Sequence, residues 1–406
     1  MDQATADTRS LVEARASFPA LERWTYLDLG GRDVLSREVR AALDAHLDDR
    51  MFNGAADKDR FFTMTEAARQ KFARLIHADA DEIAYTKNIS DGLNMVATGL
   101  EWRLGDNVIL CGELEHPNNV YPWLNQRARG LEVRFVTHHD GHMPVDDMIA
   151  RMDRGTRVVT CSTVSFSPGF RTDVDRLGRA CRERGVLFLV DAAQSAGVLH
   201  TDVQASCIDA LSVSTQKGLL GLYGMGYLYV RREWAERMRP AYLARFGVDL
   251  GKADVHESDI GEHAYELMPA ARRFDLGNYN YIGVAAADAA LKFLLELDTR
   301  NIEPYVLRNA HALAQGLGDL GFPVCGGAPG PHLAHIVCVG LYGSGGDKGG
   351  SDERMNRFYH FLIENRVKLS MRRGVLRFSL HVYNNMDDVA RVLELARQFI
   401  TADKRR

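Results

Sequence analysis

Short apolar segments rich in β-branched residues alternate with helical patterns through the middle of the chain. We expect strands at residues 107–111, 133–137, 157–163, 186–190, 210–214 and 226–230. Longer stretches with helical spacing, such as residues 173–184, separate several of them. This alternation predicts an α/β fold with a mostly parallel sheet covered by helices. Residues 186–190 (VLFLV) are apolar throughout, as expected of a strand that is buried on both faces.

The pattern changes after residue 230. Residues 233–245 have helical spacing, a polar stretch follows at 251–266, and a long helix rich in alanine and leucine is expected from Tyr281. The remainder predicts a smaller unit of helix, strand at 334–340, helix, two short strands and a terminal helix, with a boundary near residues 298–304. For the glycine-rich segment 340–350 we favour a flexible surface loop over a lid that moves across a site.

Composition narrows the class of protein. The chain has 406 residues, of which 46% are hydrophobic and 26% charged, so we expect a globular protein of two or three domains. A net charge of −4 lacks the basic excess of a nucleic-acid binder. Neither a membrane-spanning run nor a secretory signal is recognisable. The six cysteines form no C-x-x-C pair and predict free thiols in a reducing, cytoplasmic compartment.

Two segments in the middle of the chain carry candidate chemistry. Asp191 directly follows the apolar strand, where ligands gather in open α/β sheets. The alternative for Asp191 is a helix N-cap, with Gln194 completing a capping box. Lys217 follows the next expected strand, among small and apolar residues, and a desolvated lysine is a good Schiff-base nucleophile. The order of residues around Lys217 is not that of a nucleotide P-loop.

Together these segments resemble the fold-type I pyridoxal-phosphate (PLP) enzymes, and more narrowly the class V aminotransferase group. That group includes cysteine desulfurases, selenocysteine lyases and isopenicillin N epimerase-like proteins. The matching motifs are DAAQ at 191–194, SVSTQKG at 212–218, and the glycines at 224 and 226. The resemblance covers nearly the whole chain and implies pyridoxal 5′-phosphate as cofactor.

The resemblance also implies an architecture. It implies a large PLP-binding domain at residues 31–298 with a mostly parallel, seven-stranded sheet, and a small α+β domain at 299–406. An N-terminal segment, residues 1–30, would pack with the small domain. The implied assembly is a homodimer with shared active sites, without a nucleic-acid or membrane partner.

Roles for the catalytic candidates follow from the same resemblance. Lys217 would form the Schiff base with the cofactor and then move protons. Asp191 would pair with the protonated ring nitrogen, and Gln194 would donate to the phenolic oxygen of the ring. His116, in the segment EHPNNVYPW, would stack on the ring; its alternative is a surface turn before Pro117.

Phosphate and substrate contacts are implied by further motifs. A helix N-terminus at KNISDGLN would cradle the phosphate, with the remaining contacts from the ends of strands; the residues are Ile89, Ser90, Ser214 and Gln216. Asn278 in FDLGNYN, where threonine is usual, would reach the phosphate of the second subunit. Arg377 in RFSLHVYNN would grip the α-carboxylate of the substrate, the alternative being a salt bridge on an edge strand. Three further arginines could bind a second acidic group of the substrate: Arg32, Arg372 and Arg373. The alternative is that they form a solvated basic surface.

Two departures from the group limit the chemistry. No cysteine follows Cys338, so the nucleophilic cysteine of a classical desulfurase is missing and persulfide chemistry is disfavoured. Phe166 stands where an asparagine commonly contacts the ring oxygen, and Gln216 stands where histidine is frequent. We therefore expect a PLP-dependent enzyme acting on a small amino acid or amine through an external aldimine, and favour transamination over a C–S or C–C lyase or an epimerase.

Functions from other classes have less support. A non-catalytic scaffold would be expected to have lost Lys217 or Asp191, and both are present. A dinucleotide-dependent oxidoreductase lacks the G-x-G-x-x-G turn after a first strand. The histidines of THHDGH at 137–142 form no recognised ligand pattern, so no metal is expected.

Overall fold

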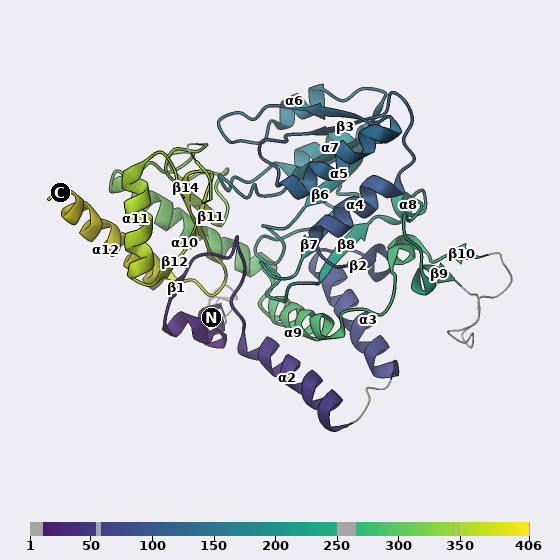
Figure 1. Cartoon of the computed structure of the whole chain (residues 1–406), viewed down its shortest axis with the longest axis horizontal. Coiled ribbons are helices and arrows are strands. Elements are labelled where there is room, and N and C mark those ends of the chain that lie inside the picture. The colour runs from purple at the N-terminus through teal and green to yellow at the C-terminus, as the bar shows by residue number, and fades with distance from the viewer. Residues whose placement is uncertain (1–10, 54–57, 250–264, 344, 348, 406) are drawn as a thin grey trace, which may run out of the picture.

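A seven-stranded sheet forms the centre of the molecule. The computed structural model describes residues 11–53, 58–249, 265–343, 345–347 and 349–405. The sheet has the strand order β2-β8-β7-β6-β5-β3-β4 (Figure 1). Its strands are β2 (Ile83–Thr86), β3 (Asn107–Leu110), β4 (Glu132–Phe135), β5 (Thr156–Ser162), β6 (Leu187–Asp191), β7 (Ala210–Ser214) and β8 (Gly226–Val230).

Strand β8 is antiparallel to both of its neighbours, and the other adjacent pairs are parallel. The mostly parallel sheet predicted from the sequence is thus confirmed. The six expected strands appear within one or two residues of their predicted ends. Strand β2 was not anticipated, because its four residues follow a helix with little punctuation.

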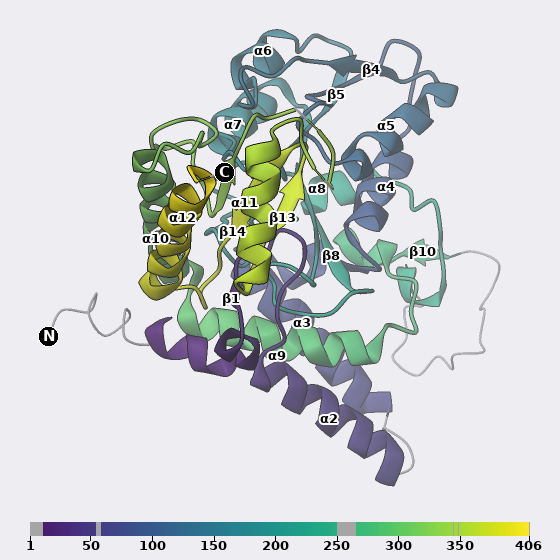
Figure 2. The ribbon, with the colours of Figure 1, turned by 60° about the vertical axis from the view of Figure 1, so that its left-hand side comes forward.

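Helices pack on both faces of this sheet (Figures 1 and 2). They are α3 (Lys58–Leu75), α4 (Ile89–Gly99), α5 (Tyr121–Gln126), α6 (Val145–Ala150), α7 (Val174–Arg184), α8 (Arg232–Ala235) and α9 (Tyr281–Leu297), and α2 (Arg37–Phe52) packs outside this layer against α9. Several begin at side-chain caps. Asp173 accepts from the Arg176 N–H at the start of α7, and Asn280 accepts from the Gly283 N–H at the start of α9.

The alternation of side chains along β6 explains why the strand is apolar throughout. Leu187 and Leu189 belong to the hydrophobic cluster on one face, together with α4 and Trp123. Phe188 and Val190 belong to the cluster on the other face, which continues into the C-terminal part of the chain. A central strand needs apolar side chains on both faces when both faces are covered.

One helix prediction was wrong. The expected helix at residues 233–245 ends after α8, at Ala235, and turns follow. Pro240 lies in the predicted segment and cannot donate a helical hydrogen bond. The Arg239 N–H instead donates to the carbonyl of Gly99. Most of the polar stretch at 251–266 lies outside the described residues; at its end, β10 (Glu266–Leu267) pairs with β9 (Val248–Asp249).

The C-terminal part of the chain forms a second, smaller layer (Figure 2). A three-stranded antiparallel sheet has the order β11-β14-β13 and packs with three helices. These elements are α10 (Thr299–Asp319), β11 (Ile336–Val339), α11 (Glu353–Glu364), β13 (Ser370–Arg372), β14 (Val375–Ser379) and α12 (Met386–Asp403). Near the N-terminus, β1 (Thr25–Tyr26) pairs in parallel with β12 (Val367–Lys368). The division into domains at residues 30 and 298 stays a prediction.

Within the described residues, no helix combines the length and the apolar character needed to cross a bilayer.

Candidate active site

Two turns at the carboxyl edge of the large sheet bring Lys217 beside Asp191. Asp191 ends β6, and Lys217 lies in the turn after β7. The turns touch through Gly197 and Gly218: a Cβ on Gly197 would lie 2.1 Å from the Gly218 carbonyl oxygen. Gly197 also has a positive φ of 84°, which favours glycine. The glycines after DAAQ and after Lys217 are therefore needed for the close approach of the two turns.

Asp191 is a buried carboxylate with one oxygen engaged. Only 4% of the residue is exposed, and Oδ1 accepts from the Ala193 N–H at 2.9 Å. Burial raises the pKa of Asp191 to about 6, while the Ala193 N–H and Lys217 oppose the shift. No helix follows Asp191, so the N-cap alternative does not hold. Within the described chain Oδ2 has no hydrogen-bond partner and is free to meet a cation or donor.

Lys217 has the electrostatic setting of a nucleophilic amine. Burial lowers its pKa to about 8, and the positive charges of Arg377 and Arg372 act in the same direction, against Asp191 and Asp28. A lysine with such a pKa has a substantial neutral fraction near physiological pH.

His116 faces the same space. Partial burial, and then the charges of Lys217, Arg372 and Arg373, lower its pKa, although the ring still reaches solvent. Its Nδ1 accepts from the Asn118 N–H at 3.2 Å. The ring meets Phe166 edge to face at a centroid distance of 5.5 Å. Phe166 therefore places an aromatic ring beside His116, at the position where the resembling enzymes commonly have an asparagine.

The predicted phosphate contacts lie at the start of α4 and the end of β7. Asn88 caps α4 by accepting from the Asp91 N–H, and the first N–H groups of a helix have no partner within it. Ile89 and Ser90 are the first two residues of this helix, and the Ser212 hydroxyl fixes it to β7 through the Ile89 carbonyl at 3.0 Å. Ser214 ends β7.

The N-terminal segment holds two of the predicted contact residues. The Gln216 carbonyl accepts from the Asp33 N–H at 3.0 Å. The Gln194 amide donates to the Gly30 carbonyl at 3.3 Å. These bonds place the segment 28–33 over the turns that carry Gln194 and Lys217.

Arg377 is buried beside Asp28, whose Oδ1 has no hydrogen-bond partner among the described residues. It lies in β14, the central strand of its sheet, and is 1% exposed, so the edge-strand salt-bridge alternative is wrong. Its Nε donates to Ser370 Oγ and its Nη1 to the Phe166 carbonyl, each at 3.0 Å. Its Nη2 lies 3.8 Å from Asp28 Oδ1, and both atoms are buried without a hydrogen-bond partner. An orphaned guanidinium donor of this kind suits a carboxylate ligand.

Two predicted residues lie apart from this group. The Arg32 side chain is exposed and, within the described residues, makes no hydrogen bond or ion pair with the others; its backbone carbonyl accepts from the Tyr26 hydroxyl. Asn278 is exposed and lines a different pocket of about 670 Å³, which contains none of the other predicted site residues. Within one chain the structure therefore does not bring Asn278 to Lys217.

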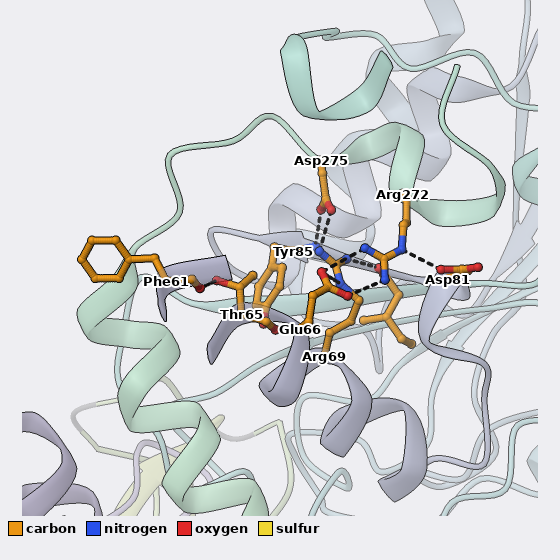
Figure 3. Close-up of polar contacts among 9 residues, drawn as sticks. Phe61, Thr65, Glu66, Arg69, Asp81, Tyr85, Arg272 and Asp275 are labelled. Carbon is orange, nitrogen blue, oxygen red and sulfur yellow. Dashed lines mark hydrogen bonds and ion pairs between the residues drawn. The ribbon is translucent and has the colours of Figure 1, made fainter. Parts of the chain in front are cut away.

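A buried ion-pair network anchors the segment that carries Asn278 (Figure 3). Asp275 accepts from Arg69 Nη2 at 2.8 Å and from the Tyr85 N–H at 3.0 Å. Arg272 bridges Glu66 and Asp81. Asn278 follows at a positive φ of 47°, which asparagine tolerates better than most residues. The segment is therefore held to α3 and β2 while Asn278 points to solvent.

Several residues of the site were not singled out from the sequence. Asp28, Ser370 and Glu115 surround the predicted residues. Glu115 is fully buried and accepts from Ser162 and Asn119. The signal for Asp28 was present, because two glycines follow the segment YLDL, and a Cβ on the first of them, Gly30, would lie 2.9 Å from Arg377 Cζ.

Solved structures share this fold. The apo cysteine desulfurase from Thermococcus onnurineus NA1 matches with a TM-score of 0.82 at 23% identity, covering 96% of this chain and 98% of that one. The cystine C–S lyase C-DES, in complex with cysteine persulfide, matches with a TM-score of 0.79 at 22% identity, covering 93% and 99%. The fold is that of the fold-type I PLP-dependent enzymes, as predicted.

Sequence relatives give the family. The profile of the family described as Aminotransferase class-V matches residues 48–348, and the chain belongs to this family. A probable cysteine desulfurase of Methanothermobacter thermautotrophicus is 30% identical over 324 residues, 78% of each chain. An uncharacterized aminotransferase, YcbU, of Bacillus subtilis is 28% identical over 380 residues, 94% of this chain and 95% of that protein.

Pyridoxal 5′-phosphate is the cofactor of this family and of this chain. The residues present fit the group. A buried carboxylate with a free oxygen, Asp191, suits a protonated ring nitrogen. The start of α4 suits a phosphate dianion, and Lys217 offers an amine of lowered pKa. The roles of individual residues toward the cofactor stay predictions.

Proposed function

We propose that this enzyme transfers the amino group of a small amino acid or amine. The observation that carries the proposal is the half-buried Lys217, with its pKa lowered to about 8, beside the buried Asp191. A C–S or C–C lyase and an epimerase are the alternatives, since they use the same groups. The specific reaction depends on which bond of the substrate is held across the cofactor ring.

The chain's own residues supply binding and proton transfer. The bound cofactor supplies an electron sink for the negative charge that develops at the substrate α-carbon. Lys217 Nζ, once released from the cofactor, accepts and returns the proton at that carbon. Asp191 keeps the ring nitrogen protonated. Arg377 Nη2, unpaired in the buried space beside Asp28, binds the substrate α-carboxylate.

Further contacts complete the proposed site. Gln194 donates to the phenolic oxygen, and His116 stacks on the ring. The phosphate is held by the start of α4 and the end of β7, through Ile89, Ser90, Ser214 and Gln216. Arg32 is exposed, and no contact in the described structure supports its earlier assignment to substrate.

The burial and the raised pKa values of the cysteines favour transamination over desulfuration, despite the names of the relatives. Cys338 is 1% exposed within β11, and burial raises its pKa well above the usual range. No cysteine follows it along the chain. Burial also raises the pKa of Cys111 to about 11 and that of Cys325 to about 12. None of these thiols has the exposure and low pKa of a nucleophile.

We further propose a homodimer in which Asn278 reaches the phosphate of the other subunit. The pocket that contains Asn278 has aromatic walls, including Phe62, which is 62% exposed, and Tyr281. An exposed apolar rim of this kind suits an interface between copies. Analytical ultracentrifugation should give a dimer, and a monomer with full activity would contradict shared sites. The reducing, cytoplasmic compartment suggested by six free cysteines stays a prediction.

The visible absorption spectrum tests the reaction. The purified protein supplied with PLP should show a band near roughly 410–430 nm, and Lys217→Ala should lack the borohydride-reducible adduct. Amino acids are then added one at a time. Conversion to a pyridoxamine-type spectrum supports transamination, whereas a persistent band during substrate consumption favours the lyase or the epimerase.

A further inference from the structure

A second arginine shares a sheet face with Arg377. Strands β13 and β14 pair with Ser370 opposite Arg377 and Arg372 opposite Val375. Side chains on one face of a strand are two residues apart, so Arg372 projects on the same face as Ser370. Ser370 Oγ accepts from Arg377 Nε. Arg372 and Arg377 are therefore diagonal neighbours on one face, within reach of a single ligand.

The charge of Arg372 acts on the same space as that of Arg377. Burial, Arg377 and Arg372 all lower the pKa of Lys217. Arg372 also lowers the pKa of His116, after burial and Lys217. Arg372 thus acts on Lys217 and His116 from the same sheet face as Arg377, next to the place where we put the α-carboxylate.

The Arg372 guanidinium uses few of its N–H donors in hydrogen bonds to the described residues. Nη1 donates to the Met371 carbonyl at 2.8 Å. Among the described residues its ion-pair partner is Asp347, on the glycine-rich segment, with Oδ2 at 3.8 Å from Nη1, beyond hydrogen-bond distance. The Arg372 side chain is 30% exposed and Asp347 is 66% exposed, so this pair is open to exchange with a ligand.

The neighbouring Arg373 is held by contacts with Tyr342, Glu113 and Phe166. Its Nη1 donates to the Tyr342 hydroxyl at 2.6 Å and to the Glu113 carbonyl. Its guanidinium lies over the Phe166 ring at 4.8 Å from the centroid. Arg373 therefore supports the Phe166 ring, and Arg372 is the arginine of this pair that lies on the same sheet face as Arg377 and has the weaker set of partners.

We propose that the substrate carries a second acidic group at the end of its side chain, and that Arg372 binds it. The inference rests on the proposed function, because it takes Arg377 as the partner of the α-carboxylate. The planar fork of Arg372 matches a carboxylate with two parallel hydrogen bonds, and Asp347 is the group that this carboxylate replaces. The substrate class is that of dicarboxylic amino acids; phosphate is the other oxyanion with the same recognition chemistry.

Binding of unreactive acids to the PLP-loaded enzyme tests the inference without turnover. Isothermal titration calorimetry compares succinate and glutarate with butyrate, which lacks the second carboxylate, and with 3-phosphonopropionate. The better dicarboxylate should bind roughly tenfold or more tightly than butyrate, as expected for a charged hydrogen-bonded pair. If the phosphonate binds best, the side-chain acid is a phosphate; if a dicarboxylate does, it is a carboxylate.

Variants separate the two arginines. Arg372→Gln should bring the ratio of dicarboxylate to butyrate affinity close to one, leaving butyrate unchanged. Asp347→Asn should tighten dicarboxylates severalfold. Arg366→Gln is the charge-matched control, since Arg366 is exposed before β12 and no described contact links it to Lys217, His116 or Arg377. If Arg372→Gln does not fold, two other variants test the inference. Arg372→Lys keeps the charge but loses the planar fork, so it should reduce the preference for dicarboxylates. Asp347→Asn should increase that preference.

Two results would overturn the inference. One is a wild-type enzyme that binds butyrate as tightly as the dicarboxylates; the other is an Arg372→Gln variant that keeps the preference. Arg377→Gln tests the proposed function separately, because it should weaken butyrate and dicarboxylates alike. Unchanged butyrate binding in Arg377→Gln contradicts the proposed α-carboxylate site, whatever Arg372 does.

Discussion

The His381 ring donates a hydrogen bond of 2.9 Å from Nε2 to the carbonyl oxygen of Gly218, the residue after Lys217. His381 Nδ1 accepts from the Val382 N–H, which leaves the proton on Nε2. Burial lowers the pKa of His381 to about 4, so the ring is neutral near pH 7. His381 follows β14, and this bond therefore connects the small sheet to the lysine turn of the large one.

We predict that His381 positions Lys217. His381→Leu removes the donor and should lower kcat by roughly tenfold or more, since small displacements of a reacting group cost rate steeply. It should also shift the pH at which the visible band of the bound cofactor changes. His381→Gln, which keeps a donor near the Nε2 position, should restore both. A change in thermal stability alone, with the spectral titration unmoved, would reduce His381 to a packing residue.

Asp191→Asn should separate cofactor binding from turnover. The amide keeps the volume but cannot hold a proton on the ring nitrogen through an opposite charge. We expect PLP to bind and kcat to fall on the order of 100-fold, similar to the loss of one preorganised electrostatic contact. Absorbance gives the occupancy and steady-state kinetics give the rate. Near-normal turnover at full occupancy would disprove the pairing.

The buried Glu115 carboxyl should remove stability from the PLP-free protein as pH rises, whereas the buried His335 and His381, whose pKa values burial lowers, act in the opposite direction below about pH 6.5. Burial, then the charge of Asp191, raises the pKa of Glu115 from 4.5 to about 7. Between these values the folded chain holds a proton that the unfolded chain has released, so the free energy of unfolding falls as pH increases, by at most ~1.4 kcal/mol per pH unit per proton. Urea unfolding of the wild type and of Glu115→Gln from pH 5 to 8 isolates this contribution. The unfolding free energy of the wild type relative to Glu115→Gln should fall as pH rises, and a constant difference would place the titration elsewhere.

The Arg69–Asp275 pair should be essential for stability. Arg69 is 1% exposed, and Arg69→Leu leaves the Asp275 carboxylate buried without its cation. Loss of one partner of a buried pair costs about 3–5 kcal/mol of unfolding free energy, measurable by urea denaturation. Arg40→Leu, which removes the exposed pair with Asp44 on α2, is the control and should change nothing measurable. Equal effects of the two variants would contradict the network in Figure 3.

The periodicity of the sequence was enough to predict the large sheet, because its strands are short, apolar and separated by turn residues. The strands at 210–214 and 226–230 appear with their predicted ends. The helix expected at 233–245 failed because helical spacing persists through a proline, and tertiary contacts decided the backbone path. Strand β2 was missed because four residues are too few for a clear period.

The candidate site was partly visible in the sequence, since Asp191 lies at the end of one predicted strand and Lys217 in the turn after the next. The partners of Arg377 were not, because a hydrogen bond to the Phe166 carbonyl and an approach to Asp28 depend on backbone placement across distant segments. The difference between Arg372 and Arg373 also needed coordinates. Adjacent residues on a strand point to opposite faces or leave it at a turn, and only their contacts show which one has free donors.

The contact between the N-terminal segment and β14 can form only late in the synthesis of the chain. The Gly30 N–H donates to Ser379 Oγ at 2.8 Å, although the two residues are 349 positions apart. A growing chain emerges from the ribosome N-terminal end first, so Asp28 and the lysine turn exist well before Arg377 does. The buried space between Arg377 and Asp28 can close only after the chain has been made as far as β14. Chains that stop before β14 therefore lack the contact between Arg377 and Asp28, even if they already contain the lysine turn.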